Sequence, residues 1–177
     1  METAWRWARF EWGGHSLFAV RSAAGLVQLT LPGEPFDEVT AFARRTAPGV
    51  RLVEDAAALA PWVDEVTAYL DGRRKTFHQP LDPRGTPFQL AVWEAIRAIP
   101  YGERRTYGQL ALALGRPRAS RAVGRATGQN PLPLVIPCHR VVARSGLGGY
   151  SDGLALKTWL LAQEAGLEAG ALPSAAR

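Results

Sequence analysis

Cys138 and His139 are the residues best suited to chemistry, and they follow an apolar run at residues 134–136. Cys138 is the only cysteine among the 177 residues, so it cannot form an intramolecular disulfide. A lone cysteine either packs as a small hydrophobic residue or acts as a nucleophile. Arg140 and Arg144 follow closely, and nearby positive charge lowers the pKa of a thiol. These surroundings favour a reactive thiolate, with a buried structural cysteine as the alternative.

Positive charge is concentrated in the same part of the chain. Residues 101–150 carry eight arginines against one acid, Glu103, within a formal net charge of +5. A localised field of this sign attracts a polyanion, above all a nucleic acid. The alternative is a solvated arginine-rich surface, because arginine outnumbers lysine 19 to 2 along the whole chain. Charge alone does not decide between the two.

The composition is that of a globular protein, with 47% hydrophobic and 21% charged residues. The length suits one domain of ordinary size or two small ones. No apolar run approaches the roughly 20 residues that cross a bilayer, and the amino terminus lacks the hydrophobic stretch of a secretory signal. A thiol without a partner fits a reducing compartment. We therefore expect a cytoplasmic protein with no membrane partner.

The first 80 residues are predicted to form a mixed α/β unit. Three short runs rich in aromatic and β-branched residues, separated by glycines, predict a three-stranded meander. Apolar residues at helical spacing predict two helices after it. The runs span residues 5–12, 15–21 and 26–31, and the helices 36–46 and 56–70. The stretch 77–85 has Pro, Gly and Asp but no periodicity, and we interpret it as a linker.

A well-marked helix opens the second half of the chain. Thr86 is a good N-cap, Pro87 suits the first helical position, and Gln89 completes a capping box. An apolar stripe follows, and Pro100 ends the helix. These signals predict a helix between residues 86 and 100.

Two short helices are then predicted at residues 106–114 and 119–128, around a turn that contains glycine and proline. This is a helix-turn-helix pattern, although helical hairpins of this kind are common. The second helix is made of small residues apart from one valine and two arginines. Gly124 in its middle costs about 1 kcal/mol relative to alanine, which makes sense where a ligand or another backbone approaches closely. A nucleic-acid backbone and a packed neighbouring helix are the two alternatives.

Together, these segments closely resemble the O6-alkylguanine-DNA alkyltransferases, which are the methylated-DNA–protein-cysteine methyltransferases. The resemblance covers about residues 85–166 densely. Its core is Asn130-Pro131 through Ile136-Pro137-Cys138-His139-Arg140-Val141, preceded by Ser120-Arg121-Ala122-Val123-Gly124. Further matching segments are 85–89 with 92–93, 99–102 with 106–107, 149–151 and 157–164.

The resemblance implies a fold of the α/β (α+β) class with two domains. Residues 1–80 match the family in layout only, as its ribonuclease-H-like amino-terminal domain. Residues 81–177 correspond to a mostly helical, winged helix-turn-helix-like domain that binds DNA and carries out alkyl transfer. This arrangement agrees with the α/β pattern and the helix-turn-helix pattern of the residues themselves.

The resemblance also implies a reaction. The family's lesion carries an alkyl group on guanine O6 inside the duplex, so the base is flipped into a pocket, from the minor-groove side. The Cys138 thiolate then displaces guanine from the alkyl carbon. The thioether product is stable, so each molecule acts once and needs no cofactor. Whether O4-alkylthymine is also repaired stays open.

By the same resemblance the catalytic residues are Cys138, His139, Glu164 and Asn130. His139 acts on the thiol through a water, Glu164 orients the imidazole, and Asn130 holds the turn before the cysteine strand. On the residues alone, Glu164 is better interpreted as a solvated residue of a carboxy-terminal helix. An extended backbone would also point the side chains of Cys138 and His139 to opposite faces.

The resemblance assigns the substrate pocket to Tyr107, Val141, Tyr150 and Ser151. It also implies that Arg121 takes the place of the flipped base in the stack. Without it, Tyr107 and Tyr150 would be half-buried core aromatics and Arg121 a phosphate contact. The full set of expected DNA contacts is Arg116, Arg118, Arg121, Ala122, Gly124 and Arg125.

Two features depart from the family pattern. Asp152 stands where a glycine is more usual, which puts a negative charge near the pocket mouth. Some members bind zinc through amino-terminal cysteines and histidines, but this chain has no cysteine before residue 138 and only His15 and His78 there. We therefore predict no metal site. The expected partner is double-stranded DNA with alkylated guanine, bound by a monomer.

Two other classes of protein compete with this interpretation. A helix-turn-helix lesion sensor or regulator would bind DNA without chemistry, and the presence of Cys138 argues against it. A cysteine hydrolase would need an oxyanion hole and a multiple-turnover Cys–His pair. The adjacency of Cys138 and His139 makes that geometry awkward.

Overall fold

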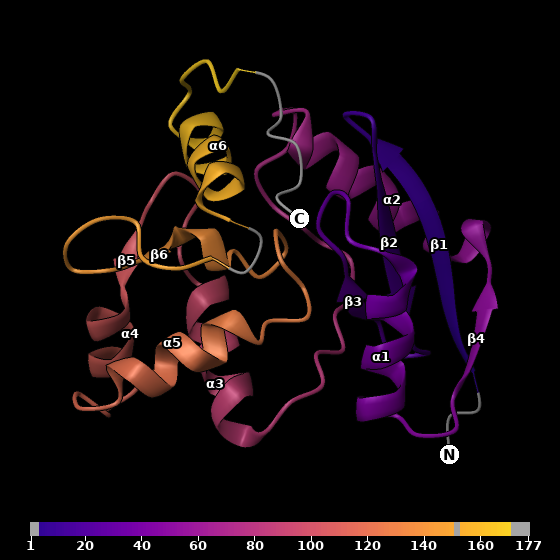
Figure 1. Cartoon of the computed structure of the whole chain (residues 1–177), viewed down its shortest axis with the longest axis horizontal. Helices are drawn as coiled ribbons and strands as arrows, with labels where there is room; N and C mark the ends of the chain where they lie inside the picture. The colour runs from indigo at the N-terminus through magenta and orange to yellow at the C-terminus, as the bar shows by residue number, and fades with distance from the viewer. Residues whose placement is uncertain (1–3, 151–152, 171–177) are drawn as a thin grey trace. The chain divides into compact units, whose positions relative to one another are not determined.

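The computed structural model describes residues 4–150 and 153–170, and the chain divides into two compact units, Met1–Arg84 and Gly85–Arg177. The first is built on a sheet of order β3-β2-β1-β4 (Figure 1). The predicted meander is present as β1 (Ala4–Trp12), β2 (His15–Arg21) and β3 (Leu26–Leu29). The prediction missed a fourth strand, β4 (Arg51–Glu54), which pairs with β1 in parallel. Its four residues are too few for a period-2 pattern to stand out.

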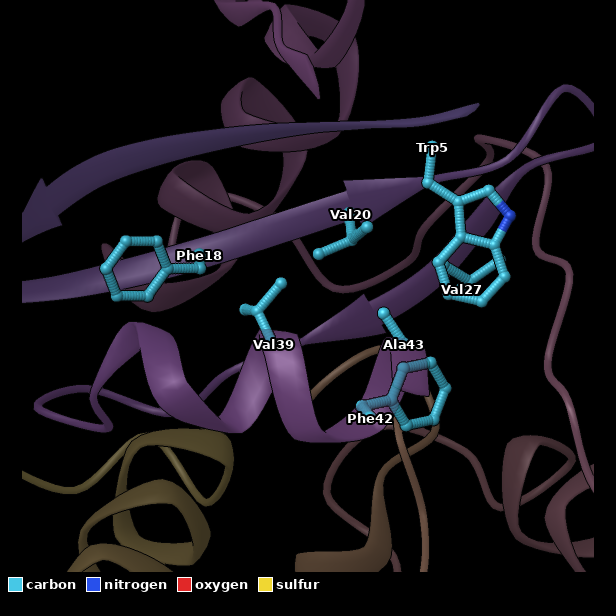
Figure 2. Close-up of a cluster of buried hydrophobic side chains, with 7 residues drawn as sticks. All are labelled: Trp5, Phe18, Val20, Val27, Val39, Phe42 and Ala43. Atoms are coloured by element: carbon cyan, nitrogen blue, oxygen red, sulfur yellow. The ribbon is translucent and has the colours of Figure 1, made fainter. Parts of the chain in front are cut away.

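Helices α1 (Phe36–Thr46) and α2 (Ala56–Leu70) have the predicted bounds. α1 packs on one face of the sheet through an aromatic and β-branched core (Figure 2). The alternate strand positions point to the other face, and α2 packs against β1 and β2. The α1 core consists of Trp5, Phe18, Val20, Val27, Val39, Phe42 and Ala43. Burial of such side chains stabilises the unit by about 1.5–3 kcal/mol each.

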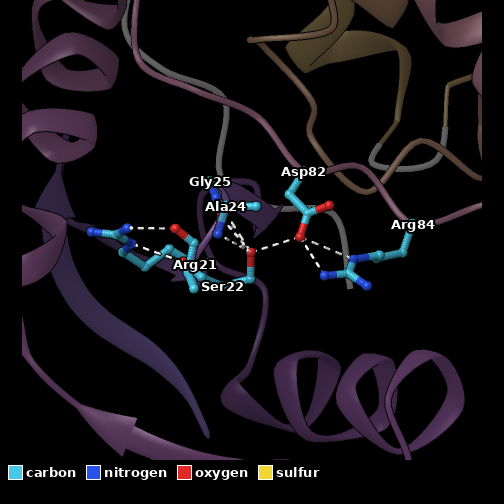
Figure 3. Close-up of polar contacts among 7 residues, drawn as sticks. Arg21, Ser22, Ala24, Gly25, Asp82 and Arg84 are labelled. Atoms are coloured by element: carbon cyan, nitrogen blue, oxygen red, sulfur yellow. Dashed lines mark hydrogen bonds and ion pairs between the residues drawn. The ribbon is translucent and has the colours of Figure 1, made fainter. Parts of the chain in front are cut away.

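The stretch interpreted as a linker is irregular but is fastened to the first unit. Leu26 donates its backbone N–H to the carbonyl of Pro80 at 3.0 Å, and Asp82 donates to the carbonyl of Leu26 at 2.8 Å. The Ser22 hydroxyl donates to the Asp82 carboxylate at 2.6 Å, and Arg84 donates to the same oxygen (Figure 3). Residues 80–84 are therefore held in place by the sheet and are not a free linker.

The second unit is mostly helical. It comprises α3 (Pro87–Arg97), α4 (Tyr107–Ala113), α5 (Ser120–Gly128), a 3-10 turn η1 (Cys138–Arg140) and α6 (Leu154–Glu164). α3 begins as predicted, because Thr86 and Gln89 form both hydrogen bonds of a capping box. Trp93 of α3 donates its indole N–H to the carbonyl of Ala126 in α5 at 2.8 Å, which fixes α5 against α3.

Two very short strands position the cysteine segment. β5 (Arg105–Thr106) pairs in parallel with β6 (Val141–Val142). This pairing brings the start of α4 beside the residues that follow Cys138. The expected cysteine strand is wrong: Cys138 lies on η1, and the strand begins only at Val141. Two-residue strands leave no periodic signal in a sequence.

Candidate active site

Cys138 lies within a buried segment, residues 131–141, and is itself 7% exposed. The segment is held by Asn130, whose amide donates to the carbonyl of Ile136 at 2.7 Å and accepts from the N–H of Leu132 at 3.0 Å. Between them, Leu134 has a φ of 70°, a left-handed conformation that costs about 1–3 kcal/mol for such a residue. Asn130 therefore stabilises a strained turn that delivers Cys138.

His139 is completely buried and faces Glu164 of α6. Its Nε2 lies 2.7 Å from Glu164 Oε1. Glu164 is also buried, so its interpretation as a solvated helix residue is wrong. The 3-10 turn, rather than an extended backbone, sets the directions of the Cys138 and His139 side chains. The imidazole is oriented by a carboxylate, as in an acid–base relay.

Arg140 is buried with Glu164 and forms a forked ion pair with it. Its Nη2 donates to Oε1 at 2.9 Å and its Nε to Oε2 at 2.9 Å. The expectation that Arg140 lowers the thiol pKa is wrong, because its charge is matched by the carboxylate. Burial raises the pKa of Cys138, while hydrogen bonds with Asn130 and Tyr150 and the charge of Lys157 act against this. The resting side chain is therefore a thiol.

His139 is held neutral. Burial lowers its pKa; the hydrogen bond and charge of Glu164 oppose that shift, and the charges of Arg140 and Lys157 add to it. A neutral imidazole can accept a proton, and the adjacent thiol has one to give. The site can therefore generate a thiolate at the moment of reaction.

This neutral histidine predicts a pH dependence of stability. The unfolded chain protonates its histidines near pH 6.5, whereas the folded protein resists protonation of His139 to lower pH. The unfolded state thus binds more protons below about pH 6.5, so the free energy of unfolding falls as the pH is lowered from there to the folded pKa. Urea unfolding between about pH 5 and 7.5 should show this slope. His139→Asn should flatten it and His15→Asn should not; equal slopes in all three proteins would refute the assignment.

Tyr107, the first residue of α4, forms one wall of the site. A Cβ atom on Gly124 of α5 would lie 3.7 Å from its ring, and one on Gly148 would lie 3.2 Å from Cε2. Burial, and then the neighbouring Cys138, raises the pKa of Tyr107, so its hydroxyl stays protonated and can donate. Of the other expected pocket residues, Val141 is buried and Tyr150 is half-buried. Ser151 and Asp152 lie outside the described residues.

The two glycines beside Tyr107 should respond differently to alanine. Gly148 has a φ of 73°, and its Cβ would also lie 3.1 Å from the amide nitrogen of Ala143. We expect Gly148→Ala to destabilise the protein by about 1–3 kcal/mol and to displace Tyr107. Gly124→Ala is the matched control: it meets only ordinary contacts and should gain up to about 1 kcal/mol of helix propensity. Urea unfolding of both variants checks the difference, and equal stabilities would contradict it.

The expected DNA-contact residues lie on and before α5. Arg121, Ala122 and Arg125 are exposed, whereas Val123 and Ala126 are buried against the unit. Gly124 is half-buried between these two sets. The exposed side of α5 therefore combines small side chains with two arginines.

The turn before α5 carries the other two expected contacts. Arg116 and Arg118 are exposed and, with Pro117 and Ala119, line a hollow of about 370 Å³. The guanidinium of Arg116 lies 5.4 Å from the centre of the Phe88 ring. None of these arginines forms an ion pair among the described residues, so their charge is available to a ligand.

Two cations at the site, Arg140 and Lys157, are buried in contacts that were not predicted from the sequence. The Lys157 ammonium donates to the carbonyls of Val141 at 2.6 Å and Gly149 at 3.2 Å. Lys157 shares the helical face of Leu160, Leu161 and Glu164, so the spacing could have revealed it. Arg140 lies outside any periodic element and had no such signal.

In residues 4–150 and 153–170, no three His, Cys, Asp or Glu side chains come together as a metal site. No helix within these ranges combines the length and apolarity that a membrane span requires.

Sequence comparison decides the family. Residues 87–166 match the family model of the 6-O-methylguanine DNA methyltransferase DNA-binding domain. The inducible methylated-DNA–protein-cysteine methyltransferase of Bacillus subtilis is 41% identical over 156 residues, 88% of this chain and 87% of that protein. The chain belongs to the methylated-DNA–protein-cysteine methyltransferase family. The predicted resemblance is thereby confirmed.

Solved structures of methyltransferases share the fold. The Mycobacterium tuberculosis O6-methylguanine methyltransferase superposes with a TM-score of 0.78 at 34% identity, over 92% of this chain and 93% of that one. The M. tuberculosis OGT in complex with DNA gives 0.77 at 34% identity, over 91% and 93%. An O6-methylguanine-DNA methyltransferase from Pyrococcus kodakaraensis gives 0.64 at 26% identity, over 90% and 98%. The mixed α/β class of the prediction is confirmed.

Proposed function

We propose that this protein repairs DNA by transferring the alkyl group of O6-alkylguanine to Cys138 in a single turnover. The observation that carries the proposal is the buried Cys138 thiol followed by His139, whose Nε2 lies 2.7 Å from Glu164, in a chain of this family. The unit with this thiol also bears the exposed arginines of α5. DNA is therefore the polyanion that its charge best fits.

The reaction follows from the protonation states. His139 accepts the thiol proton, a bond forms between Sγ and the alkyl carbon, and the bond from that carbon to O6 breaks. Guanine leaves as an anion, which a donor such as the Tyr107 hydroxyl stabilises until it takes up a proton from water, and the His139 imidazolium releases the former thiol proton to solvent. Asn130 holds the nucleophile in line. Because a thioether does not hydrolyse, the protein is consumed.

Burial of the thiol supports single use. A cysteine that is permanently ionised and exposed is prone to oxidation and side reactions. Cys138 is instead protonated and 7% exposed at rest, and His139 would remove the proton only when the alkyl carbon is in place. Because each protein molecule reacts once, protection of the Cys138 thiol from oxidation and side reactions preserves its capacity for repair.

The finer architecture and substrate belong to the same proposal. The first unit would be the ribonuclease-H-like domain and the second unit the winged helix-turn-helix domain. The exposed side of α5 would enter the minor groove, where small side chains permit close approach. The target base would be flipped into the pocket of Tyr107, Val141, Tyr150 and Ser151. The protein would act as a cytoplasmic monomer, and O4-alkylthymine would be a second substrate to test.

Arg121 would fill the gap that the flipped base leaves. We expect Arg121→Ala to impair repair of duplex DNA by about 2–3 kcal/mol, on the order of the unstacking cost, and to spare reaction with free alkylguanine. Arg118→Ala is the control: it removes a phosphate contact, so it should weaken duplex binding and reduce its salt dependence. Transfer rates on both substrates check this. Equal losses on duplex and free base for Arg121→Ala would mean that Arg121 supports the fold instead.

The proposed function is tested by stoichiometry. Excess duplex with one O6-methylguanine is incubated with the protein, and the remaining lesion is counted after digestion of the DNA. We expect one lesion removed per protein molecule and then no further reaction. A lesion sensor would bind and remove none. Repeated turnover on an ester or peptide would identify a cysteine hydrolase and overturn the proposal.

A further inference from the structure

We propose that Arg140 is a positioning residue that fixes the tautomer of His139 by keeping Glu164 a carboxylate. The kinetic test of this proposal, the rate of methyl transfer, rests on the function proposed above. Its structural test, the tautomer of His139, does not. Arg140 is a buried charge that takes no part in the bond changes of the reaction.

Glu164 is surrounded by donors. Oε1 receives Arg140 Nη2 at 2.9 Å and Nε at 3.1 Å, and Oε2 receives Nε at 2.9 Å and the backbone N–H of Gly102 at 3.0 Å. Arg140 is itself 5% exposed and donates through Nη1 to the carbonyl of Ile99 at 2.6 Å. A protonated carboxyl would put a hydrogen against one of these donors. Glu164 is therefore ionised, since an arginine does not release its proton.

The ionised carboxylate decides which ring nitrogen of His139 carries hydrogen. Nε2 lies 2.7 Å from Oε1, and a carboxylate can only accept. Nε2 must therefore be the protonated nitrogen, which leaves the lone pair on Nδ1. That lone pair is what a base needs in order to take the thiol proton, directly or through a water.

Loss of Arg140 should reverse this arrangement. A carboxyl buried without a counter-charge tends to be protonated, because burial raises its pKa. A protonated Glu164 would donate to Nε2 and put the ring hydrogen on Nδ1, or would pass its proton to the ring and make imidazolium. Neither form has a free lone pair for the thiol proton.

The other charges around His139 do not replace Arg140. Lys157 of α6 is bonded to the carbonyls of Val141 and Gly149, not to Glu164. Cys138 is a thiol at rest. Tyr101 lies beside the pair, with the Arg140 guanidinium 5.5 Å from its ring centre, and remains a neutral phenol because burial raises its pKa. Arg140 is thus the cation that holds Glu164 ionised.

The Arg140–Glu164 pair is also tied to the turn that leads into the pocket. Its two backbone partners, Ile99 and Gly102, precede β5, and Tyr107 follows β5. The positions of His139 and Tyr107 therefore both depend on the same turn. A shift of this turn would displace the general base His139 and the pocket residue Tyr107 together.

Nitrogen-15 NMR of the histidine-labelled full chain tests the proposal, with His139 assigned by its loss in His139→Asn. In the wild type between about pH 6 and 8, we expect hydrogen on Nε2 and none on Nδ1. Arg140→Met should show hydrogen on Nδ1 or on both nitrogens. Its methyl transfer should slow about a hundredfold or more, as a wrong histidine tautomer does in a catalytic triad.

Arg140→Lys keeps the charge, so it should retain the wild-type tautomer and most of the rate. Arg105→Met removes an exposed arginine of the same unit, paired with Glu103 at 2.8 Å, and should change neither. Hydrogen on Nδ1 in the wild type, or the wild-type tautomer in Arg140→Met, would overturn the proposal. If Arg140→Met does not fold, hydrogen on Nδ1 in the wild type or in Arg140→Lys would still overturn the proposal. The expected tautomers without any transfer would refute the proposed function and leave this inference standing.

Discussion

Cys138→Ala protein should bind alkylated duplex DNA and leave every alkyl group in place. The thiol sulfur forms the new bond to the alkyl carbon, and the alanine side chain has no atom that can do so. Affinity for DNA should stay within a few-fold, because we propose that the exposed arginines bind the DNA, whereas Cys138 is buried. Transfer assays with labelled methylguanine and binding assays on the same duplex measure the two effects.

Cys138→Ser is the matched variant, since it keeps the size of the side chain. A hydroxyl is a far weaker nucleophile than a thiol at neutral pH, so its transfer should also be lost. Binding without transfer in both variants separates chemistry from recognition. Removal of methyl groups from DNA by Cys138→Ala would defeat the assignment of the nucleophile outright.

Glu164→Ala should destabilise the second unit by about 3–5 kcal/mol, the usual result of leaving a buried charge unpaired. Arg140 is 5% exposed, and Glu164 is its charged partner at 2.9 Å. The change also removes the partner of His139, so transfer should fall with stability. Urea unfolding followed by tryptophan fluorescence measures the loss.

The exposed pair of Glu103 and Arg105 gives a control within the same unit. Its side chains are 49% and 42% exposed, so Glu103→Ala should cost less than about 1 kcal/mol. If the two variants lose equal stability, the buried pair is not the anchor that its geometry indicates.

The helices of this chain could be predicted because their signals are local. Thr86 and Gln89 mark the start of α3 by a capping box, and apolar spacing sets the bounds of α1 and α2. The missed strands β4, β5 and β6 have four residues or two. Each forms by pairing with a strand that is distant in the sequence, and no short sequence pattern predicts such a pairing.

The sequence and the resemblance named the residues of the candidate site that the structure brings together, Cys138, His139 and Glu164, but not the charge states of its groups. The candidate nucleophile was predicted from the lone Cys138 beside His139, and the family resemblance added Glu164. The partner of Arg140 could not be deduced, because Glu164 lies 24 residues further on. The pKa of the thiol was therefore predicted in the wrong direction: the burial that raises it is a property of packing.

The central claim is that the alkyl group ends on Cys138, and the mass of the protein tests it most directly. The wild-type chain is incubated with duplex DNA that contains one O6-methylguanine, and its intact mass and proteolytic peptides are measured. We expect one methyl group in place of one hydrogen, on the peptide with Cys138, in every reacted molecule. Loss of the methyl group from DNA with no gain on that peptide would contradict the account.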